Sequence, residues 1–158
     1  MEDFNKLLNN SKKKLALADY MLTNTYEMLK EPKILLSILQ NIDLAFMNSL
    51  RSILVFERIF KRVPVFGESY TSMSNIYLSK VQKRYKFDSK FIKNMNKIKE
   101  ITESHISSQI EFERKEDFII ADDNYKLKKI TKNEIILFLK CGKEFNQKIT
   151  KILEDYND

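Results

Sequence analysis

Apolar or small residues recur along the first part of the chain at alternating spacings of four and three. The stripe consists of Phe4, Leu8, Ser11, Leu15, Ala18, Leu22, Thr25 and Leu29. Because an α-helix has about 3.6 residues per turn, this pattern predicts one face of a long amphipathic helix. The helix should end near Lys30, since Pro32 disfavours the helical conformation at Glu31 and is suited to start another helix. A tight turn over Lys30–Lys33 then predicts that the first two helices are antiparallel neighbours.

A second helix is predicted from Lys33 to Arg62, and its apolar residues are not confined to one face. Its main stripe repeats the spacing of the first helix: Leu35, Leu39, Ile42, Phe46, Ser49, Ile53, Phe56 and Phe60. One flank adds Leu36, Met47, Leu50 and Leu54. Such a helix either lies at the centre of its bundle or contributes to a subunit interface. The sequence leaves both interpretations open.

Two shorter helices are predicted after the segment Val63–Gly67 interrupts the second one. The first runs from Ser69 to about Tyr85 and carries Met73, Ile76, Tyr77, Leu78 and Val81. The next starts at Asp88 or Ser89, either of which can cap a helix, and continues to His105.

The segment before the last helix has the pattern of a β-hairpin. Phe118–Ala121 is apolar, Asp122–Asn124 favours a turn, and Tyr125–Ile130 alternates apolar with cationic residues. These features predict one small hairpin. Thr131 followed three residues later by Glu134 is a capping box that opens the last helix.

Composition narrows the fold and the chemistry. The 158 residues include two glycines, two prolines, one cysteine and one histidine. Glycine-rich phosphate loops, disulfide frameworks and His/Cys metal sites are therefore not expected, and neither are cofactors. Sandwiches and barrels need frequent turn residues, which this chain lacks. We expect an all-α fold, an antiparallel bundle of about five helices with one small β-hairpin before the last helix, in a single domain over residues 1–158.

The sequence also indicates in which cellular compartment the protein is expected. The start, Met1–Phe4, is acidic and polar and does not resemble a secretory signal. The most apolar region, Ile34–Phe60, is interrupted by polar and charged residues and has no run of about 18 apolar residues. We expect no membrane contact and a cytoplasmic protein.

The positive charge is concentrated in one segment. The net charge is +6, but Lys61–Lys99 holds ten cations against two carboxylates, so this segment carries +8 and the remainder −2. Such an excess can attract a phosphate backbone or an acidic partner. Cations and aromatic residues alternate there, which suits backbone tracking and base stacking. The candidate nucleic-acid-binding residues are Lys80, Lys83, Arg84, Tyr85, Lys86, Lys90, Lys93 and Lys97. The competing interpretation is a lysine-rich composition, since 23 of the 28 cations are Lys.

Two residues are candidates for catalysis, and two others in the last helix are better explained by packing. His105 is the first candidate for acid–base chemistry near neutral pH, and Arg51 is its possible partner in an atypical RNase site. His105 lies on the inward stripe of its helix, which favours a half-buried histidine at the edge of the core. Cys141 lies in an apolar helical run, which predicts a buried, unreactive thiol, and Gly142 predicts close helix approach. No catalytic residue is assigned.

Polar residues on the otherwise apolar second helix could line a groove or an interface. They are Asn48, Arg51, Glu57 and Arg58. If buried, such residues need partners, so the alternative is ordinary solvation with a salt bridge between helices.

The chain resembles the HEPN superfamily of helical bundles. Leu17–Leu22, Leu29–Lys33 and Ile42–Ala45 through to Arg58 are similar to its first two helices, and Glu111–Lys115 with the hairpin after it is similar to an uncharacterised archaeal branch. The resemblance implies a helical bundle, a homodimer, and RNA or a protein partner such as a nucleotidyltransferase.

Active HEPN proteins are metal-independent RNases with an Arg, four to six intervening residues and then a His on a late helix. No Arg precedes His105 at that spacing, and the last helix has no His. The sequence therefore favours a noncatalytic HEPN-like binding or assembly module that associates with RNA. The alternatives are an RNase with an atypical site around His105, and a protein-partner adaptor or toxin–antitoxin component.

Overall fold

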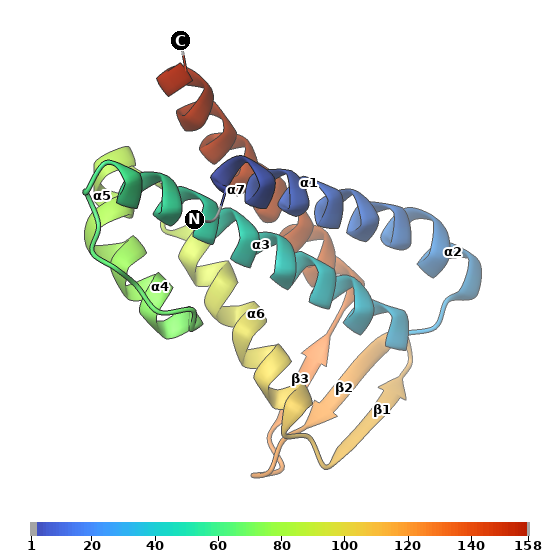
Figure 1. The fold of residues 1–158 in the computed structure, drawn as a ribbon. Helices are drawn as coiled ribbons and strands as arrows, with labels where there is room; N and C mark the ends of the chain where they lie inside the picture. Colours follow the sequence, from blue (N-terminus) through green and yellow to red (C-terminus); the bar gives the residue numbers. More distant parts are fainter. Residues whose placement is uncertain (1–2, 158) are drawn as a thin grey trace.

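The computed structural model describes residues 3–157 and contains, in that part of the chain, five helical rods and a small sheet. The first rod joins α1 (Phe4–Tyr20), the π-helical turn η1 (Met21–Thr25) and α2 (Tyr26–Leu29). The second rod, α3 (Lys33–Ile59), returns along α1, which confirms the predicted antiparallel pair (Figure 1). The start at Met1–Glu2 lies outside the described residues.

The π-helical turn changes which residues of the first rod face the core. A π turn contains one residue more than an α turn and so rotates everything that follows it. Tyr26 is consequently buried, whereas Leu29 is 55% exposed. The predicted stripe holds as far as Leu22, and its continuation through Thr25 and Leu29 is wrong, because residue spacing alone does not reveal the inserted residue.

The helix α3 is the centre of the bundle. α1, α6 (Lys90–Ile106) and α7 (Lys132–Asn157) all pack on it. Its fully buried side chains include Leu35, Ile38, Leu39, Ile42, Leu50, Ile53 and Leu54. The apolar faces that suggested a subunit interface are thus covered by the chain itself, which supports the first of the two interpretations.

Small and polar residues hold α1, α3 and α7 close together. The Ser11 hydroxyl donates to the Ala45 carbonyl at 2.8 Å and lies 2.7 Å from the Ser49 hydroxyl. The Asn146 amide donates to Ser49 Oγ at 3.3 Å. A Cβ on Gly142 would lie only 3.0 Å from Leu15 Cδ2. Gly142 therefore permits the close helix approach that the sequence predicted.

The third rod joins α4 (Tyr70–Ile76), the π turn η2 (Tyr77–Val81) and α5 (Gln82–Tyr85), and α6 follows it. The Ser69 hydroxyl accepts from the Ser72 N–H at 3.1 Å, and the Asp88 carboxylate accepts from the Lys90 N–H at 2.8 Å. The predicted starts of both helices are therefore confirmed.

The region before α7 is a three-stranded antiparallel sheet rather than one hairpin. The strands β1 (Ile110–Arg114), β2 (Asp117–Ala121) and β3 (Leu127–Ile130) lie in the order β1-β2-β3. The hairpin of β2 and β3 confirms the sequence prediction, but β1 was missed. Its sequence, IEFER, is charged and mostly exposed, so it lacks the apolar signal of a strand. Backbone pairing with β2 stabilises it instead.

Candidate nucleic-acid interface

A cationic pocket lies where α3 ends, beside the third rod. Its volume is about 450 Å³, and four cations line it: Arg58, Lys61, Arg62 and Lys80. The rest of its lining is the apolar segment Val63–Val65, and no lining residue is acidic. The pocket thus combines concentrated positive charge with a small apolar surface.

The termination of α3 gathers three of these cations. Lys61 adopts a left-handed conformation with φ 56°, and the Arg62 N–H donates to the Glu57 carbonyl at 3.0 Å. This bond closes the helix and turns the chain, as at many helix C-termini. The helix ends at Ile59, so the predicted end at Arg62 is wrong, because a lysine occupies the left-handed position that glycine usually marks.

Glu57 lies beneath the cations as a buried carboxylate. It is 0% exposed, and its Oε2 is 3.5 Å from Arg62 Nε and 3.9 Å from Arg84 Nε. Among the described residues, neither carboxylate oxygen accepts a hydrogen bond. A buried charge needs a partner, and here two guanidinium groups supply it, one from the segment after α3 and one from α5 in the third rod.

The two arginines face Glu57 with Nε and therefore keep their terminal nitrogens for other partners. Arg62 Nη1 donates to the Tyr85 hydroxyl at 3.4 Å, and its guanidinium lies 4.8 Å from the centre of the Phe60 ring. The Arg84 side chain is 43% exposed. A guanidinium held in this way can present a planar pair of donors to a phosphate.

The structure assigns different surroundings to the predicted nucleic-acid-binding residues. Lys80 lines the pocket, and Arg84 adjoins it through Glu57. Lys83, Lys86, Lys93 and Lys97 are exposed.

Tyr85 is poorly placed as a free stacking platform. Its ring packs against Phe87 with centroids 6.1 Å apart, and its hydroxyl accepts from Arg62. Burial, together with the nearby Glu57 carboxylate, raises the pKa of Tyr85 to about 12. The tyrosine therefore helps to hold Arg62, which lines the pocket.

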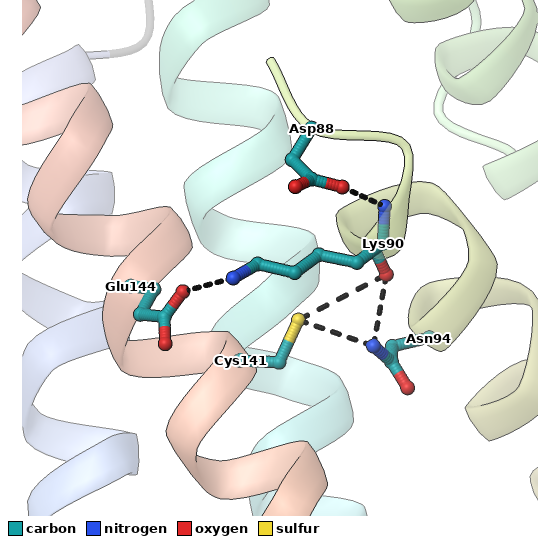
Figure 2. A network of polar contacts seen from close by, with 5 residues as sticks. All are labelled: Asp88, Lys90, Asn94, Cys141 and Glu144. Carbon is teal, nitrogen blue, oxygen red and sulfur yellow. Dashed lines mark hydrogen bonds and ion pairs between the residues drawn. The ribbon is translucent and has the colours of Figure 1, made fainter.

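Lys90 is tied into a polar network between α6 and α7 (Figure 2). Its ammonium group pairs with Glu144, and its carbonyl accepts from the Asn94 amide at 2.9 Å. The same amide lies 3.3 Å from Cys141 Sγ. The charge of Lys90 is therefore paired with a carboxylate of α7 and helps to hold the two helices together.

The network also explains the chemistry of the only thiol. Burial raises the pKa of Cys141 to about 11, against smaller opposing effects of Asn94 and Lys90. A thiol with such a pKa is protonated at neutral pH and is a weak nucleophile. The prediction of a buried, unreactive cysteine agrees with this arrangement.

His105 and Arg51 have separate partners. His105 Nδ1 lies 2.8 and 3.0 Å from the two carboxylate oxygens of Glu111 on β1. The Ser108 hydroxyl has two acceptors, a Glu111 carboxylate oxygen at 2.8 Å and the His105 carbonyl at 2.9 Å. It therefore does not donate to the imidazole, as the nucleophile of a Ser–His pair would. Arg51 instead pairs with Glu68 at 3.4 Å, in the segment before α4. His105 thus ties α6 to the sheet.

The four polar residues expected to share a groove on α3 are also divided. Arg58 lines the cationic pocket, Glu57 is buried under it, and Arg51 pairs with Glu68. Asn48 is half-buried. The interpretation as a salt bridge between helices fits Glu57, which pairs with Arg84 of α5, whereas Arg51 pairs with Glu68 outside any helix. The sequence did not predict the role of Arg58 in the pocket.

Lys61 and Arg62 belong to the basic segment, but the alternation of cations and aromatic residues does not mark them as site residues. The signal that could have found them is the spacing of Arg58, Lys61 and Arg62, which gathers cations at a helix end, with Lys80 and Arg84 repeating a four-residue spacing. That the two groups meet depends on how the rods pack.

Comparisons with protein-family models, curated proteins and solved structures found no match to this chain. Within residues 3–157, no helix combines the length and apolarity needed to cross a membrane. In the same part of the chain, no three His, Cys, Asp or Glu side chains are grouped as a metal site would require. The candidate interface therefore rests on its geometry.

Proposed function

We propose that the chain is a noncatalytic, HEPN-like binding and assembly module of the cytoplasm, and that it binds RNA through the cationic pocket. The observation that carries the proposal is the meeting of four cations from two segments around a pocket with no acidic lining. Lysine and arginine clusters bind nucleic-acid backbones by neutralising phosphates and releasing counterions. Val63–Val65 adds apolar surface for sugar or base.

The resemblance to HEPN bundles also implies a homodimer and a protein partner such as a nucleotidyltransferase. The dimer in this proposal does not use the core faces of α3, because α1, α6 and α7 cover them. The separate partners of His105 and Arg51 favour a binding module over an RNase.

Salt-dependent binding to a generic single-stranded RNA tests the function. We expect the logarithm of the affinity to fall with the logarithm of salt concentration with a slope of about −3, because each neutralised phosphate contributes about −0.7 for single strands. The double variant Lys61→Ala/Lys80→Ala should reduce the slope to about −1.5. Fluorescence anisotropy of labelled RNA measures both.

The matched control is Lys12→Ala/Lys140→Ala, which removes two exposed lysines away from the pocket. It should leave the slope near the wild-type value. An equal reduction of the slope in both double variants would contradict the proposed site, because RNA binding would then depend only on the net charge of the protein. Metal-independent cleavage of the RNA would instead support the RNase alternative.

A further inference from the structure

We propose that the cationic pocket binds a terminal phosphomonoester of a nucleotide chain in preference to internal phosphodiesters, and that Glu57 is the positioning residue that orients the arginines for it. This inference rests on the proposed RNA-binding function and specifies which part of the RNA enters the pocket.

The first argument concerns shape. A volume of about 450 Å³ is comparable to that of small-ligand pockets, which span roughly 300 to 1,000 Å³. The cations Arg58, Lys61 and Lys80 share the pocket with Val65, which is 73% exposed. A terminal nucleotide matches this combination, because it has one strongly charged end and a less polar sugar and base.

The second argument concerns charge. A phosphomonoester carries a charge of about −1.5 to −2 at pH 7, whereas an internal phosphodiester carries one negative charge. Four cations around one pocket repel each other, and a ligand with two negative charges offsets more of this repulsion. The excess positive charge therefore favours the terminal group.

The third argument concerns the buried carboxylate. Glu57 Oε2 lies 3.5 Å from Arg62 Nε and 3.9 Å from Arg84 Nε, and so restricts both guanidinium groups without using their terminal nitrogens. Restricting a side chain before a ligand arrives lowers the entropy that binding costs. Tyr85 adds a second restraint on Arg62, as acceptor of its Nη1–H at 3.4 Å.

The experiment compares one RNA sequence in three forms: with hydroxyl groups at both ends, with a 5′-phosphate, and with a 3′-phosphate. We expect at least one phosphorylated form to bind about tenfold tighter than the hydroxyl form, as an added charge-assisted hydrogen bond would allow. Competition with adenosine monophosphate shows whether a free nucleotide can occupy the same pocket. Equal affinity of all three RNAs would overturn the inference while leaving salt-dependent RNA binding intact.

Two variants test the positioning role. Glu57→Gln keeps the side-chain volume but removes the charge that orients Arg62 and Arg84, so the affinity ratio of phosphorylated to hydroxyl RNA should fall to about threefold. Arg62→Lys keeps the charge and loses the planar donor pair, so the ratio should fall while the salt slope stays. Lys12→Ala/Lys140→Ala should keep the tenfold ratio. An unchanged ratio in folded Glu57→Gln and in Arg62→Lys would refute the role assigned to Glu57.

Discussion

At the scale of single residues, burial decides which ionisable groups are available for chemistry. Burial raises the pKa of Cys141 to about 11 and is the main reason that the pKa of Tyr85 is raised to about 12. Both groups stay protonated at neutral pH. His105 is held by Glu111 at the junction of α6 and β1. Glu57 has no exposed surface, so it can act on a ligand only through Arg62 and Arg84, which it contacts directly. In the proposed function, the residues that reach the RNA are therefore the lysines and arginines that line the pocket.

The raised pKa of Cys141 predicts a loss of stability at alkaline pH. The unfolded thiol ionises near its ordinary pKa of 9.0, but the folded thiol holds its proton to about 11. Stability linked to this group is therefore complete below pH 9 and decreases as the pH rises towards 11.

We test this with Cys141→Ala, which removes the titrating group. Between pH 8 and 10, the wild type should lose more unfolding free energy than the variant, by on the order of 1 kcal/mol. Urea denaturation at each pH measures it. A larger loss in the variant would contradict the assigned cause.

At the scale of elements, lysines perform the chain reversals that glycines usually perform. Lys30, Lys61 and Lys86 have φ values of 52°, 56° and 54°, and each closes or follows a helix. Lys115 does the same between β1 and β2 with φ 57°. A chain with two glycines can therefore still make tight turns, at a conformational cost that the packing of the rods must offset.

Helix packing around Gly142 gives a second prediction at this scale. Gly142→Ala should change stability by less than about 1 kcal/mol, because the gain in helix propensity opposes the contact of the new Cβ with Leu15 Cδ2 at 3.0 Å. Gly142→Leu should destabilise by about 2 kcal/mol or more, since Leu15 and Phe46 leave no space for it. Chemical denaturation compares the variants, and a stable Gly142→Leu protein would mean that α1 and α7 can separate.

At the scale of the whole molecule, one hydrophobic core joins all five rods and the sheet. It extends from Leu8 on α1 to Leu153 on α7 and includes Phe118, Ile120 and Ile130 from the strands. The cations of the +8 segment, by contrast, do not form one surface: Lys80 lines the pocket, while Lys90 pairs with Glu144 of α7. Local charge in the sequence is therefore an imperfect guide to surface charge.

The continuous core predicts cooperative unfolding of the chain as a single domain. Far-UV circular dichroism, which reports mostly on the helices, and tyrosine fluorescence should give coincident urea transitions. Two separated transitions would show that the sheet or the third rod unfolds independently.

Apolar periodicity and capping residues act over a few neighbouring positions, and for this reason the sequence alone predicted the helices, most of their boundaries and the hairpin of β2 and β3. It could not determine the π turn that exposes Leu29 or the pairing that makes β1 a strand, since an inserted residue and backbone hydrogen bonds leave little trace in residue type. It indicated a basic segment but not the pocket. Arg58 and Lys80 meet only because α3 and the third rod pack side by side, and Glu57 engages Arg62 and Arg84 only because the core buries it. Such contacts between distant segments are decided by tertiary packing.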